Sequence, residues 1–306
     1  MRWKQIVLLV LITLFTTSVA AAEETTNKIS FSVGKLDGKT LYTISGSDSG
    51  GWKSKLVFPL ETKFTTIYYS TKFEKVQWGV QRINCSIGQN LDNKNNGLMK
   101  DSDWIYAWSS DKVIYSETKA DLEALQGKLE FVGPSYYYNQ QLSYQFQSGY
   151  QYKNFAYNVH DGIQYNYDSG TQTEITGKAL EYDVRYHIPY LGVKFKNHNH
   201  KTVNWQVNLD LAPYVKAKDI DDHILRYKES IGETTGAAIM VTSSLSYNIK
   251  SNVIFSLSGA YSKIETTGYQ DQYWYDGPDQ GQEINNIAHT IDLESYTIKT
   301  TINYLF

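Results

Sequence analysis

The feature that most constrains this chain is an alternation of apolar and polar residues that recurs from about residue 140 to the C terminus. A period of two is the pattern of β-strands whose two faces meet different surroundings. The runs hold their phase over about ten residues or more, whereas strands of soluble sandwiches average about five or six. The final run has one apolar face made of Tyr296, Ile298, Ile302, Tyr304 and Phe306.

Strands of this length can cross a bilayer, and tyrosines near strand ends are typical of the aromatic girdles of outer-membrane proteins. We therefore predict an all-β fold: a ten-stranded antiparallel transmembrane β-barrel with short periplasmic turns and long extracellular loops. A periplasmic β-sandwich is the alternative. Short turns are expected near residues 73–76, 133–139, 196–201 and 250–252, and long loops near residues 45–51, 94–118, 158–177, 219–235 and 266–290.

Composition removes several other classes of protein. The mean hydropathy of −0.45 excludes a helical membrane protein. A net charge of −3 gives no electrostatic reason to expect nucleic acid as a partner. The single cysteine excludes a disulfide framework and a cysteine-rich zinc site. His198 and His200 lie in a polar turn without a third ligand nearby, so no metal is expected.

The N terminus has the pattern of a secretory signal peptide. Arg2 and Lys4 precede an apolar run over residues 6–15, and small residues at 20–22 suit a cleavage site. This run is too short for a membrane-spanning helix, which needs about 20 residues. We therefore predict a signal peptide at 1–22 and an outer-membrane β-barrel at 23–306, in a Gram-negative bacterium.

Two of the expected loops carry clustered carboxylates on what would be the same outer rim. One contains Asp101 and Asp103, and the other contains Asp219, Asp221 and His223. Acidic loops are usually only solvated, and either cluster alone is a weak indication of function. A close aspartate couple together with an aspartate and a histidine two residues apart is more specific, because these groups can carry out acid–base chemistry.

At this point the sequence resembles the omptin family of outer-membrane proteases, and the likeness runs nearly end to end. It rests on SVGKLDGKT at 32–40 with Gly50-Gly51 and Lys53 after it, DSDW at 101–104, IPYLG at 188–192 and DDH at 221–223. Members of this family are ten-stranded barrels with an active site in a groove at the extracellular rim. The resemblance implies that Asp221 and His223 form a catalytic dyad that faces the catalytic couple Asp101 and Asp103.

Each implied role has a physical reason. A carboxylate beside an imidazole favours the protonated ring that forms when His223 removes a proton from water. Two close carboxylates cannot both ionise cheaply, so Asp101 and Asp103 are expected to share a proton and hold the attacking water. No serine or cysteine nucleophile is required, so we expect direct attack by water without an acyl-enzyme.

The chain departs from the family at positions that set specificity. Members that cleave between basic residues have a glutamate where Tyr42 stands and an aspartate where Asp219 stands. One of two carboxylates for a substrate cation is therefore missing. Asp111 matches a family carboxylate on the far side of the cleaved bond. The expected substrate-binding residues are Asp219, Asp111 and Tyr42.

The family also binds lipopolysaccharide on its outer wall. Tyr150 and Arg185 fall at matching positions, although strict alternation turns Arg185 inward. We expect contact with lipopolysaccharide and outer-membrane lipid, with lipopolysaccharide as a candidate requirement for activity and no other cofactor. We also expect a monomer.

The leading hypothesis is therefore an omptin-like endopeptidase, with its site outside the cell, that cleaves exposed, cationic peptides or proteins. The alternative is a non-proteolytic omptin-fold barrel that acts in adhesion or recognition. A lipid-modifying enzyme would need a serine and histidine at a recognisable spacing. A diffusion pore is disfavoured because about ten strands leave an interior that side chains can largely fill.

Overall fold

The computed structural model describes residues 25–306 except 47–50, 95, 107–108 and 198–202. The predicted signal peptide and the pair His198 and His200 lie outside the described residues. None of the helical structure in the described ranges is long and apolar enough to cross a membrane. The strands are β1 (Thr25–Gly46), β2 (Trp52–Pro59), β3 (Thr62–Gln77), β4 (Val80–Asn90), β5 (Leu98–Trp104), β6 (Ile114–Val132), β7 (Tyr136–Tyr137), β8 (Leu142–Asn166), β9 (Thr171–Asn197), β10 (Val203–His223), β11 (Lys228–Lys250), β12 (Val253–Trp274) and β13 (Glu283–Leu305).

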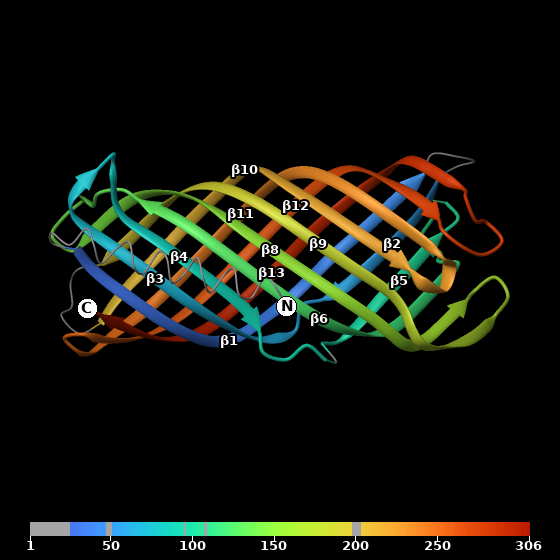
Figure 1. The fold of residues 1–306 in the computed structure, drawn as a ribbon, viewed down its shortest axis with the longest axis horizontal. Coiled ribbons are helices and arrows are strands. Elements are labelled where there is room, and N and C mark those ends of the chain that lie inside the picture. Colours follow the sequence, from blue (N-terminus) through green and yellow to red (C-terminus); the bar gives the residue numbers. More distant parts are fainter. Residues whose placement is uncertain (1–24, 47–50, 95, 107–108, 198–202) are drawn as a thin grey trace.

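The strands form one antiparallel sheet that closes into a ring (Figure 1). Neighbouring strands pair in turn from β1 through β13, β12, β11, β10, β9 and β8 to β6. Two broken strands fill the space between β6 and β1. At the end of the barrel where the C terminus lies, β1 pairs with β3, β3 with β4, and β4 with β6. At the opposite end, β1 pairs with β2, β2 with β5, and β5 with β6. Because β2–β3 and β4–β5 each act as one long strand and β7 has only 2 residues, the predicted ten-stranded barrel is confirmed.

The polarity of the two barrel faces inverts along each long strand. At the C-terminal end of the barrel, Ser30 and Ser32 of β1 are buried in the interior, and Phe31 and Val33 are exposed on the outer wall. Towards the opposite end, Tyr42 of the same strand is buried inside, and the outward positions are polar except for Leu41. The first part is therefore organised for a lipid surround, and the second part is organised as a soluble protein with its own apolar interior.

This inversion corrects the predicted orientation of one strand. The alternation of β9 predicts an apolar face towards lipid, which would turn Arg185 inward. Instead Tyr182, Val184 and Tyr186 are buried in the barrel, and Arg185 lies on the outer wall. The alternation itself is present, but periodicity alone does not indicate which face is inside, because apolar side chains also fill the barrel interior beyond the membrane.

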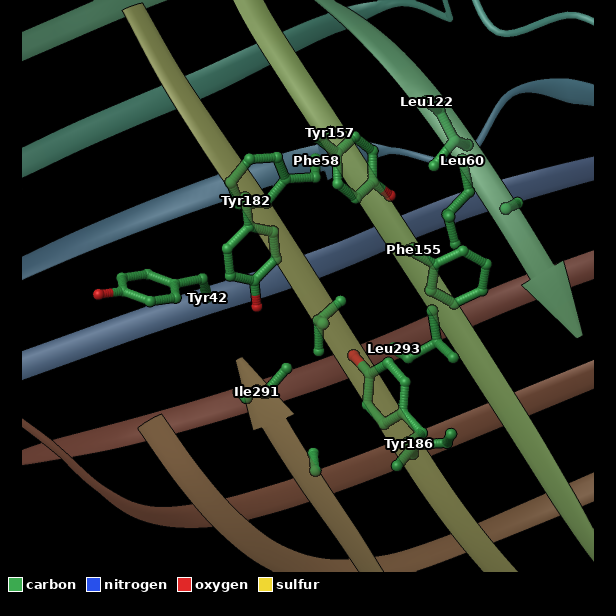
Figure 2. Close-up of a cluster of buried hydrophobic side chains, with 14 of the residues drawn as sticks. Tyr42, Phe58, Leu60, Leu122, Phe155, Tyr157, Tyr182, Tyr186, Ile291 and Leu293 are labelled. Atoms are coloured by element: carbon green, nitrogen blue, oxygen red, sulfur yellow. The ribbon is translucent and has the colours of Figure 1, made fainter. Parts of the chain in front are cut away.

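The apolar interior is a layer of tightly packed rings and aliphatic side chains (Figure 2). Phe58 stacks on Tyr182 with ring centroids 4.3 Å apart and planes 11° apart. Tyr157 packs against both rings, with its centroid 4.9 Å from that of Phe58 and 6.2 Å from that of Tyr182. Phe58, Tyr157 and Tyr182 are each at most 3% exposed. On the C-terminal side of this layer the interior is polar and holds a cavity of about 350 Å³.

Three of the segments expected to be long loops are instead extended hairpins. β8 and β9 are joined by residues 167–170, β10 and β11 by residues 224–227, and β12 and β13 by residues 275–282. Beyond the membrane the outer wall needs no apolar side chains, so these strands lack the pattern that marks the membrane-spanning parts. The turn expected near 73–76 lies instead at Trp78-Gly79, where both φ angles are positive, as a two-residue hairpin turn requires.

The long strands carry one end of the barrel well beyond the membrane. β9 has 27 residues. At about 3.3 Å per residue and a tilt of about 45°, such a strand covers roughly 60 Å along the barrel axis, about twice the hydrocarbon thickness of ~30 Å. The rim formed by the β8–β9, β10–β11 and β12–β13 connections is therefore expected to stand roughly 30 Å outside the bilayer core.

Candidate active site

Four of the predicted site residues lie on strands at this rim. Asp101 and Asp103 are on β5, and Asp221 and His223 are the last inward-facing residues of β10. The sequence placed all four in loops. Strands hold these side chains more rigidly than loops would, because ladder hydrogen bonds to β2, β6, β9 and β11 fix the backbone on both sides.

The aspartate and histidine of β10 form a close pair. The Nε2 atom of His223 lies 3.0 Å from Oδ2 of Asp221, within ion-pair distance, although the two groups are not aligned as a hydrogen bond. The side chain of Asp221 is 1% exposed and that of His223 is 14% exposed. The imidazole therefore stands between a buried carboxylate and the open rim, which is the arrangement of a general base with its orienting acid.

One member of the aspartate couple on β5, Asp101, is buried in a way that favours its protonated form. Asp101 is 8% exposed, and its Oδ1 atom is buried without a hydrogen-bond partner. Burial raises the pKa of Asp101 to about 7, and the nearby charge of Asp103 acts in the same direction, while Arg226 opposes it. Near neutral pH this carboxyl therefore carries a proton for much of the time and can donate a hydrogen bond.

Two basic residues connect the couple to the dyad across the rim. Arg226, in the turn η2 (Ile224–Arg226) that follows His223, places its Nη2 atom 3.8 Å from Oδ2 of Asp103. Lys228 is 8% exposed, and burial lowers its pKa, while the negative charge of Asp221 opposes this. The two acidic clusters therefore face the same space. Sequence reasoning missed both basic residues, because neither belongs to a motif with a recognisable spacing.

Two of the expected substrate-binding residues are packed together beneath the dyad. Asp219 is 2% exposed, and its carboxylate oxygens lie 3.1 and 3.2 Å from Nε2 of His289 on β13. Tyr42 is 1% exposed and packs against the same imidazole, with ring centroids 4.6 Å apart. His289 was not predicted. The sequence contains one signal for it: His289 shares the alternation of Ile287, Ile291 and Leu293, which places its side chain inside the barrel.

Asp111 lies apart from this group. It is exposed in the connection between β5 and β6, where its backbone N–H donates to the hydroxyl of Ser109 and its carboxylate accepts from the hydroxyl of Ser110. No described contact joins it to Asp101, Asp103 or His223. The described residues contain no group of three or more His, Cys, Asp or Glu side chains that could hold a metal ion.

The two residues expected to contact lipopolysaccharide lie on the outer wall of neighbouring strands. Tyr150 of β8 is 40% exposed, and its hydroxyl is hydrogen-bonded to Nδ1 of His187 on β9. Arg185 of β9 is exposed and pairs with Asp183 at 2.7 Å. Both side chains are therefore accessible from outside the barrel.

Comparison with known proteins gives the family. The sequence model of the Omptin family matches residues 23–306. The chain belongs to the omptin family. This omptin has the fold of the outer membrane protease OmpT from Escherichia coli, with a TM-score of 0.79 and 16% sequence identity over 94% of this chain and 99% of that chain.

More distant barrels resemble this omptin only in general form. The outer membrane protein OprG from Pseudomonas aeruginosa is 10% identical, with a TM-score of 0.36 over 92% of this chain and 97% of that chain. The attachment invasion locus protein Ail of Yersinia pestis is 6% identical, with a TM-score of 0.23 over 89% and 98%. No curated protein matches in sequence. This omptin is an outer-membrane barrel with a protease fold.

Proposed function

We propose that this omptin is an endopeptidase that cleaves exposed peptides or proteins by direct attack of water. The observation that carries the proposal is the pair of His223 and Asp221, 3.0 Å apart, which opens onto the same space as the buried couple Asp101 and Asp103. His223 takes a proton from water as the water oxygen bonds to the scissile carbonyl carbon. Asp221 stabilises the imidazolium that results.

The couple Asp101 and Asp103 acts on the other reacting groups, the scissile carbonyl oxygen and the attacking water. Protonated Asp101 donates a hydrogen bond to the carbonyl oxygen as that oxygen becomes negative, and Asp103 accepts one from the attacking water. When the tetrahedral intermediate collapses, the carbon–nitrogen bond breaks and His223 returns its proton to the leaving amine. The products are a carboxylic acid and an amine, and no covalent enzyme intermediate forms.

The acidic side chains of the rim support a preference for substrates that carry a net positive charge. Exposed carboxylates gather on the β5–β6 connection and on the β12–β13 connection with the strand ends that flank it: Asp111, Asp271, Asp276, Asp279 and Glu283. An acidic rim attracts cationic peptides and raises their association rate. Because the rim is expected roughly 30 Å beyond the bilayer core, the proposed substrates are peptides or protein segments outside the membrane.

Cleavage of a fluorogenic cationic peptide mixture by the purified barrel, in detergent with lipopolysaccharide, tests the proposal. His223→Ala, Asp221→Asn and Asp101→Asn are each expected to lower kcat/KM by about 100-fold or more. Asp222→Asn is the matched control, since Asp222 is adjacent to the dyad but faces the outer wall, where the hydroxyl of Tyr275 donates to it. A wild type that cuts no peptide, or variants as active as the wild type, would contradict the proposal.

We also propose that lipopolysaccharide binds the outer wall around Tyr150 and Arg185 and that the active form is a monomer. Lipopolysaccharide carries phosphate groups that a guanidinium can bind. If this is correct, omission of lipopolysaccharide lowers activity, Arg185→Ala raises the concentration needed to restore it, and the mass of the active particle fits one chain.

A non-proteolytic surface barrel is the second candidate. One observation favours it: Arg226 lies 3.8 Å from Asp103 and so occupies part of the couple that would hold water. Under this function, cells that carry Asp221→Asn would adhere to host surfaces or matrix proteins as well as cells that carry the wild type. Under the protease function, cleavage is lost in the same variant.

A further inference from the structure

A buried group made of Asp219, His289 and Tyr42 lies directly beneath the proposed dyad and would form the floor of a substrate groove at this rim. Asp219 is two residues before Asp221 on β10, so both side chains point into the barrel, and Asp219 lies about 7 Å further along the strand, which is about 5 Å deeper along the barrel axis at a tilt of about 45°. A substrate side chain that points into the barrel beside the scissile bond would meet this floor. The protein side chains of the floor therefore limit which substrate side chain fits beside the scissile bond.

The carboxylate in the floor already has a partner. His289 Nε2 lies 3.1 and 3.2 Å from the two oxygens of Asp219, and His289 Nδ1 lies 3.2 Å from the backbone oxygen of Thr43. The carbonyl of Thr43 can only accept, so Nδ1 carries a proton, and a second proton is shared between Nε2 and the carboxylate. Wherever that second proton lies, the pair as a whole is neutral. The side chains of His289 and Asp219 are 0% and 2% exposed. A substrate arginine or lysine would have to displace this imidazole to reach Asp219.

The space around this pair is also filled. The ring of Tyr42 lies against His289, with centroids 4.6 Å apart, and edge-on against Tyr182 at 5.8 Å, while its hydroxyl donates to Oε1 of Gln270 at 2.6 Å. On the neighbouring strand β11, a single methyl group added to Gly232 would stand 2.2 Å from Oδ1 of Asp219. On the side of β11 the floor therefore has no room for one more carbon atom between Gly232 and the carboxylate.

We propose that His289 and Tyr42 are specificity-determining residues that close the floor of the groove, so that this protease cleaves next to a small, uncharged side chain and not next to arginine or lysine. This proposal rests on the proposed peptidase function. It separates two levels of recognition. The acidic rim attracts cationic chains from a distance, whereas the closed and neutralised floor selects the residue at the bond that is cut.

The test uses peptides of one cationic sequence that differ only in the residue at the proposed cleavage position: alanine, leucine or arginine. Wild type in detergent with lipopolysaccharide is expected to cleave the alanine peptide with a kcat/KM at least tenfold above that for arginine. His289→Ala frees the Asp219 carboxylate and opens space, and it should raise the arginine-to-alanine ratio at least tenfold. Tyr42→Ser opens space while the pair of Asp219 and His289 stays, and it should raise the leucine-to-alanine ratio without favouring arginine.

His160→Ala is the matched control, since His160 lies on the outer wall of β8 and contacts Asp121 and Asp161. Heat-modifiable migration on gels shows which variants fold, and either floor variant alone tests the proposal. Wild-type preference for arginine or lysine, or unchanged ratios in both floor variants, would overturn it.

Failure of the peptidase function gives a different result, namely no cleavage of any peptide. In that case the same peptides are compared by fluorescence anisotropy. Tighter binding of the alanine peptide than of the arginine peptide by wild type, reversed in His289→Ala, supports a closed floor even without catalysis. Equal binding of the two peptides by wild type, or no change in His289→Ala, refutes it.

Discussion

Replacement of Asp101 by asparagine should make this omptin more stable at alkaline pH while it abolishes the proposed activity. Burial, together with the charge of Asp103, raises the pKa of Asp101 from 3.8 to about 7. Between these two values the folded protein holds a proton that the unfolded chain has lost. Stability therefore falls as pH rises from about 4 to about 7, and the whole penalty is present above pH 7.

The size of this penalty follows from the shift. One pKa unit corresponds to about 1.4 kcal/mol, so ionised Asp101 lowers the free energy of unfolding by about 4 kcal/mol above pH 7. Asparagine is nearly isosteric with aspartate and stays neutral, so the variant avoids this cost. Asp101→Asn and wild type should be equally stable near pH 4, and the variant should be more stable by up to about 4 kcal/mol near pH 8.

Urea unfolding in detergent micelles, followed by tryptophan fluorescence at pH 4, 6 and 8, measures this difference. Asp111→Asn is the control, because Asp111 belongs to the same acidic region but is exposed. Its stability should follow that of wild type at every pH. A variant Asp101→Asn no more stable than wild type at pH 8, or a gap that is the same at all three pH values, would refute the reasoning.

Three further changes test other parts of the structure. Arg226→Gln removes a cation that lowers the pKa of Asp101, so this carboxyl should ionise above pH 7, and the pH profile of peptide cleavage should move in the alkaline direction; an acidic shift contradicts the assignment. Phe58→Ala removes a ring that is 0% exposed and should lower the free energy of unfolding by about 3–5 kcal/mol, measured in urea at pH 5; a loss below 1 kcal/mol would mean that the apolar layer repacks. Gly232→Ala forces a carbon against Asp219 and should cost about 1–3 kcal/mol in the same assay, with no loss expected if the floor is open.

The sequence predicts the barrel because lipid imposes a simple rule on the membrane-spanning segments. Outward side chains must be apolar there, so a period of two survives in the sequence, as in the final run from Tyr296 to Phe306. Beyond the membrane this rule no longer applies. The upper parts of β8, β9, β10 and β12 have polar outer faces, and their strands are held by backbone hydrogen bonds that side-chain patterns do not reveal.

Side-chain patterns in the sequence likewise reveal only part of the candidate active site. Asp101, Asp103, Asp221 and His223 could be proposed because short motifs carry them and family resemblance supplies their roles. The pairing of Asp219 with His289 could not, since the two residues are 70 positions apart and meet only across the closed barrel. Arg226 reaches Asp103 through the same closure. Contacts across the interior depend on strand tilt and register, which alternation alone leaves open.

The apolar layer around Phe58 and Tyr182 also makes the barrel an electrical insulator. An ion in the polar cavity would have to give up its hydration to pass between rings and aliphatic side chains that are almost completely buried, and this loss of solvation is costly in a medium of low dielectric constant. The outer membrane can therefore carry an open catalytic site on its external side and keep its permeability barrier, because the apolar layer beneath the site also blocks the passage of ions.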